Sequence, residues 1–161
     1  MIGLVKDLFD ASADNRMFLA ARFASGDAAE AALDEYRMQI QEQFFPKRGF
    51  GNPKMSVCRK VISDYRKARG DLNGIVELMI TMLETGTQFT NTYGDIHEPF
   101  YNSLLTMLGE LCKVLRTKEG APVYAEFQNR LDDLEHAASG IGWGYSGEVS
   151  SMIQDLREFY S

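Results

Sequence analysis

Apolar residues recur every three or four positions along most of this 161-residue chain. The two clearest stripes are Leu72, Ile75, Val76, Met79, Ile80 and Leu83, and Leu104, Leu105, Leu108, Leu111, Cys112 and Leu115. Such spacing places each stripe on one face of an α-helix. Val, Ile and Thr, which favour strands, total 22 and nowhere alternate with polar residues over a strand length. The sequence therefore predicts an all-α fold.

Seven to eight helices are expected in a single domain, 1–161, because this length is typical of one domain. We place them at 2–11, 15–24, 28–43, 54–69, 72–90, 97–116, 122–137 and 147–159. Start and stop signals support these bounds: Gly70 ends a helix and Asp71 caps the next, Asn52 and Pro53 begin one, and Gly120 and Pro122 repeat the stop and start.

Short connections make neighbouring helices antiparallel. We expect 54–69 to pair with 72–90, and 97–116 with 122–137, as two hairpins stacked on each other. The pairs share no recognisable sequence repeat, so a helical bundle and a short α-α superhelix both remain open. Segment 44–53 contains Gly and Pro but also Phe44, Phe45 and Phe50, and we expect a packed loop that shields these rings from water.

Charge is distributed unevenly along this acidic chain. The net charge is -6, but residues 46–70 hold eight basic residues and one acidic residue, for +7, while the other 136 residues hold nine basic and 22 acidic, for -13. At about 100° per residue, Arg59, Lys60, Arg66 and Lys67 share the polar face of the helix expected at 54–69.

This basic face has two interpretations. It can bind anions such as phosphate or a nucleic-acid backbone. The favoured alternative is a solvated face compensated by acidic residues, notably Asp132, Asp133 and Glu135. A nucleic-acid-binding domain is usually basic as a whole, so a nucleic-acid partner is possible but not favoured.

The segment 91–103 is the densest cluster of functional side-chain types. Its structural explanation is a helix start, with Asp95 as N-cap and Glu98 three residues on. The functional alternative makes Asp95, His97 and Glu98 metal ligands or an acid/base group, with His136 as a conceivable partner across helices. Three ligand types within four residues converge poorly on one ion, so we expect neither a metal nor a cofactor.

Glycines dominate the loop before the last helix. Gly142 to Gly147 matches the pattern GxGxxG, but no strand precedes it and only 14 residues follow, so a dinucleotide site is rejected. A tight turn between two helices is favoured, with Ser146 as N-cap. Trp143 and Tyr145 then either pack inward or form a contact surface.

The cysteines and the first residues suggest where in the cell the protein is located. Cys58 and Cys112 stand alone on apolar helix faces, which favours buried, reduced thiols in a cytoplasmic protein. The first residues show neither an export signal nor a lipid anchor. The most apolar stretch, 75–83, contains Glu77 and is far shorter than the roughly 20 residues that span a bilayer, so no membrane association is expected.

Three blocks carry a resemblance to a known family: FFPKRGFGNPK (44–54), FTNTYGDIHEPFYNSL (89–104) and IGWGYSGE (141–148). In this order, with helices between them, they resemble a mainly bacterial family of small helical proteins labelled as a domain of unknown function. The resemblance covers residues 30–160 and leaves out the Ala-rich part, 11–32. It implies one cytosolic helical domain and no activity, cofactor or catalytic residue. It also suggests that the three blocks meet at one end of the stack.

Three functions follow, in order of preference: a non-enzymatic interaction module that binds a protein or a second copy, a nucleic-acid or phosphate-binding accessory protein, and a small-molecule or metal-dependent enzyme around Asp95, His97 and Glu98. An enzyme is less favoured because no catalytic constellation with its required context is present. The candidate binding surface comprises Lys47, Arg48, Arg59, Lys60, Arg66, Lys67, Asn91, Tyr93, Asp95, His97, Glu98, Tyr101, Asn102, Trp143 and Tyr145.

Overall fold

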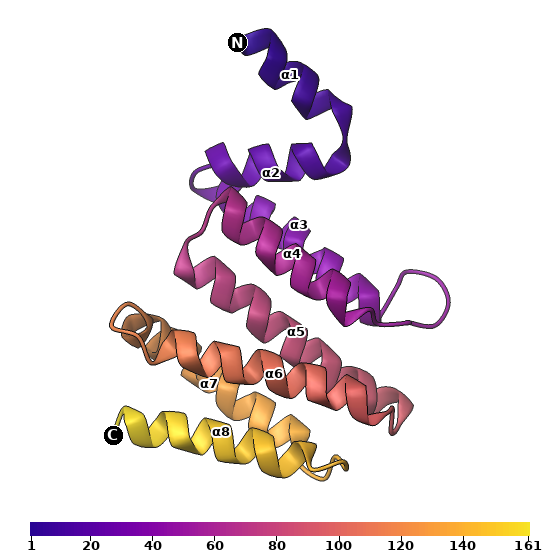
Figure 1. Cartoon of the computed structure of the whole chain (residues 1–161), viewed down its shortest axis with the longest axis vertical. Helices are drawn as coiled ribbons and strands as arrows, with labels where there is room; N and C mark the ends of the chain where they lie inside the picture. Colours follow the sequence, from indigo (N-terminus) through magenta and orange to yellow (C-terminus); the bar gives the residue numbers. More distant parts are fainter.

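Eight α-helices and no strands make up the fold, as seen in a computed structural model that describes residues 1–161 (Figure 1). Their bounds are α1 (Ile2–Ala11), α2 (Ala13–Phe23), α3 (Asp27–Phe44), α4 (Met55–Ala68), α5 (Leu72–Tyr93), α6 (Glu98–Leu115), α7 (Gly120–Ala138) and α8 (Tyr145–Phe159). The all-α prediction is confirmed, and each expected helix lies within a few residues of an observed one.

The helices lie across the long axis of the molecule in a stack that begins with α1 and ends with α7 and α8 (Figure 1). From α3 onward, each helix runs opposite to the one before it. Both expected hairpins are present, since α4 contacts α5 and α6 contacts α7. Helices two apart in the chain also pack closely: α5 contacts α3 and α7, and α6 contacts α8. The result is an elongated stack of antiparallel helices.

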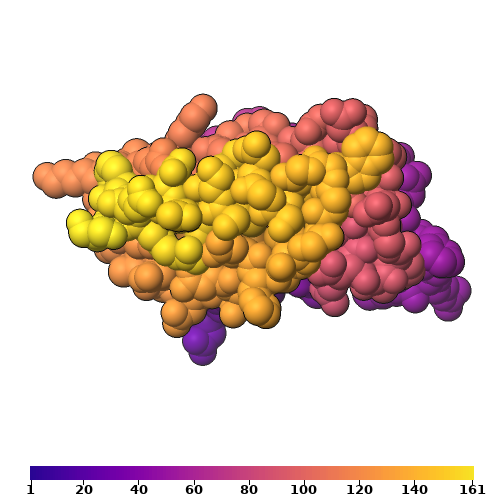
Figure 2. All heavy atoms as spheres, turned by 90° about the horizontal axis from the view of Figure 1, so that it is seen from below, coloured from indigo at the N-terminus to yellow at the C-terminus, as the bar shows by residue number.

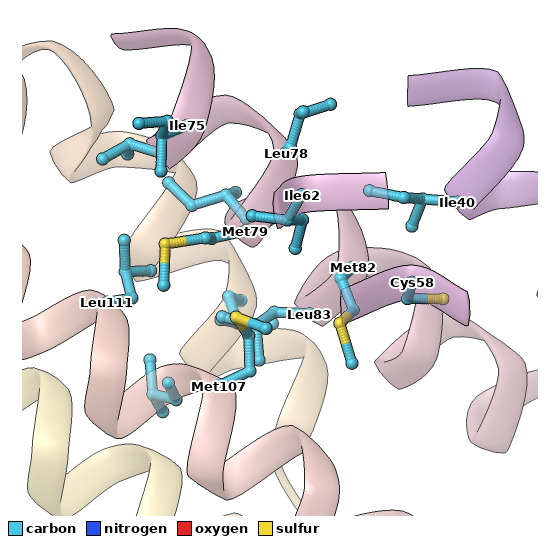
Figure 3. Close-up of a cluster of buried hydrophobic side chains, with 14 of the residues drawn as sticks. Ile40, Cys58, Ile62, Ile75, Leu78, Met79, Met82, Leu83, Met107 and Leu111 are labelled. Carbon is cyan, nitrogen blue, oxygen red and sulfur yellow. The ribbon is translucent and has the colours of Figure 1, made fainter. Parts of the chain in front are cut away.

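Helix α5 is the centre of the core. Fourteen of its 22 residues are buried, and Figure 3 shows its side chains between residues of α3, α4 and α6. One continuous apolar cluster of 37 buried residues extends from Ala21 in α2 to Leu156 in α8. The core continues along the whole stack below α1, because each amphipathic helix buries its stripe against several others.

Both cysteines are buried free thiols, as expected. Burial raises the pKa of Cys58 to about 12 and also raises the pKa of Cys112. Both side chains therefore act as small apolar residues of the core.

Helix boundaries differ from the expected ones at two loops. Asp71 caps α5 as predicted, its carboxylate accepting a hydrogen bond from the Gly74 amide at 2.9 Å. Pro53 does not start α4, which begins at Met55 after Lys54. Gly120 does not end a helix but begins α7, where a Cβ would lie 2.4 Å from the carbonyl oxygen of Val114. Glycine is therefore needed there for close backbone approach rather than as a stop signal.

None of the eight helices combines the length and apolar character that crossing a membrane requires.

Candidate functional site

Three connections lie at one end of the helices: α3 to α4, α5 to α6 and α7 to α8 (Figure 1). Each connection overlaps one of the three sequence blocks, at 44–54, 89–104 and 141–148, and the rest of each block extends into the adjoining helices. Every second connection in an alternating antiparallel stack returns to the same end, so the topology itself brings the blocks together. Lys47, Tyr93 and Trp143 are thus on one end, and the expected gathering of the blocks is confirmed.

Side-chain contacts join the second block to the first block and to the α7–α8 connection. The ring of Tyr93 lies 5.0 Å from that of Phe50 and 6.0 Å from that of Phe45. The Asp95 carboxylate lies beside Gly142, and the Asn91 amide donates a hydrogen bond of 2.8 Å to the carbonyl oxygen of Ala137. These contacts fix the loops to one another and use part of the polar segment for structure.

Two of the predicted contact aromatics belong to the core. Tyr101 and Tyr145 are fully buried, with ring centroids 5.4 Å apart. Their hydroxyls pair with Thr90 at 2.7 Å and with Thr87 at 2.8 Å. Including them in a binding surface was wrong, because α5 offers buried threonine hydroxyls that allow both phenols to be buried without an unsatisfied polar atom.

Some residues that were proposed as metal ligands or acid/base groups instead help to begin a helix, but the residues that cap α6 and α8 are not the predicted ones. His97, not Asp95, caps α6: its Nδ1 accepts from the Phe100 amide at 3.2 Å. Ser146 does not cap α8, which starts after Gly144; its hydroxyl accepts from the Gly140 amide instead. At α6, Asp95 and His97 are both able to cap, and the loop conformation selects His97. At α8, the left-handed Gly144 occupies the N-cap position and no side chain caps the helix. No group of three or more His, Cys, Asp or Glu side chains is placed to hold a metal ion.

A pocket of about 340 Å³ lies where the first two blocks meet. Phe89 and Phe100 line it together with Asn52, His97 and Ser103. No charged carboxylate, lysine or arginine side chain lines the pocket, so it suits a small neutral or aromatic group better than an anion. Glu98 and Asn102 are exposed on α6 but do not line it.

Two exposed aromatic residues mark the same end. Phe50 is 79 % exposed, so the expectation that the loop shields it was wrong: its ring rests on Tyr93 and leaves its other side in water. Trp143 is 57 % exposed and has a φ of 58°, a left-handed conformation that is uncommon for a residue other than glycine.

The basic face of α4 is partly neutralised, though not by the acidic residues expected. Arg59 pairs with Glu110 of α6 at 3.1 Å, and Lys60 pairs with Asp64 of its own helix. Lys47 pairs with Glu42 at 3.6 Å. The exposed cations without an ion pair in this region are Arg48, Lys54, Arg66 and Lys67.

The expected acidic partners lie on α7, away from α4. Asp132 and Glu135 pair with Arg157 of α8, and Glu135 also accepts a hydrogen bond from Ser150. Together with His136 they line a small polar pocket of about 280 Å³. Arg59 finds its partner on α6 and Lys60 finds its partner on α4 itself. The acidic residues of α7 were the wrong choice because the sequence does not indicate which helices come close to α4.

The most unusual surface is one that sequence reasoning missed, the apolar face of α1 and α2. Helix α1 packs against α2 and has no buried residue. Its Ile2 is 89 % exposed, and Phe23 of α2 is 77 % exposed. Phe18 of α2 is also exposed, but it lines a separate pocket with Tyr36, Lys60 and Lys67. The other exposed apolar residues of this hairpin are Met1, Ile2, Leu4, Val5, Leu8, Phe9 and Phe23. We call them the hairpin face.

A groove runs between the two helices of this hairpin. Its volume is about 620 Å³, and seven of the eight residues that line it are hydrophobic. The lining residues are Met1, Ile2, Val5, Lys6, Phe9, Leu19, Ala20 and Phe23. Ile2, Val5 and Phe9 have the helical spacing that predicts a buried stripe, so the sequence did contain the signal. Only the structure shows that no other part of the chain covers this stripe.

No known protein family, curated protein or solved structure matches this chain. The resemblance to a bacterial helical family therefore stays a hypothesis.

Proposed function

We propose that this chain is a non-enzymatic interaction module that binds a protein partner through the hairpin face. The supporting observation is the exposed apolar surface of α1 and α2. Seven large apolar residues, about two-thirds exposed on average, amount to roughly 900 Å² if a fully exposed large side chain offers about 200 Å². The largest apolar patch on a monomeric protein is usually about 300 to 600 Å². An excess of this size favours a surface that is covered in the working protein.

Alternatives have less support. For nucleic acid, two of the four helical cations, Arg59 and Lys60, are already paired with carboxylates, which leaves Arg66 and Lys67 as a small cationic surface. An enzyme around His97 has less support because its Nδ1 already accepts a hydrogen bond from the Phe100 amide at the start of α6. A cytosolic location belongs to the same proposal, since both cysteines are free thiols.

Photo-cross-linking in living cells tests the proposal. The photoreactive residue p-benzoylphenylalanine replaces Phe23 in one variant and Phe50 in the other, two phenylalanines of nearly equal exposure. We expect a discrete protein adduct from position 23, and its loss when Ile2→Glu places a charge beside it. Equal labelling from positions 23 and 50, or none from position 23, would contradict a role for the hairpin face.

A further inference from the structure

The two ends of the stack differ in chemistry. The α1–α2 end is apolar, whereas the other end is covered by α7 and α8 (Figure 2). The exposed residues of α8 are mostly polar and include Glu148, Gln154, Asp155 and Glu158. Stacked-helix proteins need polar outer faces on their terminal units to remain soluble. Here α8 meets that requirement and α1 does not.

This difference restricts how copies of the chain can associate. Head-to-tail stacking would press the hairpin face onto Glu148, Asp155 and Glu158, and burying carboxylates against apolar side chains is strongly unfavourable. Two hairpin faces brought together bury apolar groups against apolar groups. A face-to-face contact of this kind is closed by a twofold axis and leaves both polar ends outside.

The area available suits such a contact. The hairpin face exposes roughly 900 Å², and a standard stable interface buries about 800 Å² per partner. The groove between α1 and α2 is continuous with this face and is lined by both helices. Two helices of one copy against two of another give the layered packing of a four-helix bundle.

The charge of the α1–α2 hairpin allows it to bind a second copy or a neutral protein. The same charge does not favour binding to an anionic membrane. Residues 1–23 carry three basic side chains, Lys6, Arg16 and Arg22, and three acidic ones, Asp7, Asp10 and Asp14. A neutral hairpin lacks the Lys- and Arg-rich polar face that draws amphipathic helices to anionic lipid. Two such hairpins also do not repel each other.

Building on the proposed function, we propose that the partner at the hairpin face is a second copy of this chain. The two α1–α2 hairpins pack face to face about a twofold axis and form a four-helix interface between two stacks. The loop end and the basic face of α4 stay outside this contact.

Sedimentation velocity of the purified full chain, from about 1 to 100 μM, tests the inference. We expect a species of twice 18.1 kDa. Phe23→Glu and Ile2→Glu should each weaken the dimer at least about 100-fold, as expected for a charge at the centre of an apolar interface. Phe50→Glu, a matched substitution at an equally exposed phenylalanine on the loop end, should leave the dimer unchanged.

Circular dichroism serves as the folding control, since neither Ile2 nor Phe23 belongs to the core cluster and both variants should keep their helical signal. A monomer throughout the concentration range overturns the inference, as does a dimer that Phe23→Glu leaves intact. Flotation with phosphatidylcholine–phosphatidylserine vesicles tests whether the hairpin face binds lipid instead. A monomer that binds these vesicles through Phe23 also overturns the inference of self-association. A monomer that still gives a position-23 adduct to another protein in cells defeats self-association but sustains the proposed function.

Discussion

At the scale of single residues, buried phenols show how a surface prediction can fail. Tyr101 and Tyr145 stand in polar, loop-like sequence, yet both are fully buried. Each hydroxyl meets a threonine of α5, Thr90 or Thr87, that is itself buried. Burial raises the pKa of Tyr145 to about 12 and outweighs the hydrogen bond with Thr87, which lowers the pKa. The pair of hydrogen bonds anchors the loop end to the central helix.

Removing one of these hydroxyls tests the assignment. Tyr145→Phe should lower the free energy of unfolding by about 1 to 2 kcal/mol, because the Thr87 hydroxyl loses its buried partner. Tyr93→Phe is the matched control: its ring is partly exposed, and the change should be below about 0.5 kcal/mol. Urea denaturation measures both, and equal effects would argue against a buried hydrogen bond at Tyr145.

At the scale of elements, the fit between α5 and α6 depends on a glycine in the middle of a helix. A Cβ on Gly86 would lie 2.7 Å from a methyl carbon of Leu104, which is fully buried. Glycine normally weakens a helix interior. Its presence in α5 is explained by the closeness of α6 rather than by flexibility.

Alanine substitutions at two helical glycines separate these effects. Gly86→Ala should destabilise the fold by about 1 to 3 kcal/mol through overpacking against Leu104. Gly109→Ala in α6, where no atom lies within 4 Å of the new Cβ, should stabilise it by about 0.5 to 1 kcal/mol. Thermal unfolding followed by circular dichroism measures both. A stabilising Gly86→Ala would show that α5 and α6 are not in close contact there.

At the scale of the whole molecule, one carboxylate links three layers of the stack. Glu77 of α5 pairs with Arg37 of α3 at 3.0 Å and with Arg130 of α7 at 2.5 Å. Arg130 also holds Glu84 at 2.7 Å. Burial alone would raise the pKa of Glu77, but the hydrogen bonds and charges of Arg130 and Arg37 outweigh it and hold the pKa below its ordinary value of 4.5.

A lowered pKa gives Glu77 a defined pH dependence. Its contribution to stability is present above pH 4.5 and is lost as the pH falls through the folded-state pKa. Glu77→Gln should therefore cost about 1 to 2 kcal/mol at pH 7, because Arg37 and Arg130 each lose one charged hydrogen-bond acceptor while keeping Asp34 and Glu84. The difference from wild type should shrink below pH 4.5. Urea denaturation across this range measures it. Glu35→Gln, an exposed control on α3, should change stability by less than about 0.5 kcal/mol throughout.

Helix caps and helix ends were predictable from sequence where only one nearby residue suits the role. The cap at Asp71 and the stop at Gly70, which has a φ of 76°, are examples. Where neighbours compete, local reasoning failed: Asp95 and His97 can both cap α6, and the loop conformation selects His97. The gathering of the three loop blocks was predictable because alternation of direction requires it.

The sequence by itself determined the helices, their order and the apolar stripe of each, since a period of 3.6 residues is a property of the chain alone. Only the tertiary structure decided which stripes are covered. Ile75 and Met79 of α5 and Ile2 and Val5 of α1 follow the same pattern, yet the first pair is buried and the second is exposed. Periodicity specifies that a face needs a partner, but helices distant in sequence supply that partner. For α1 this chain supplies only α2, which leaves much of the stripe exposed.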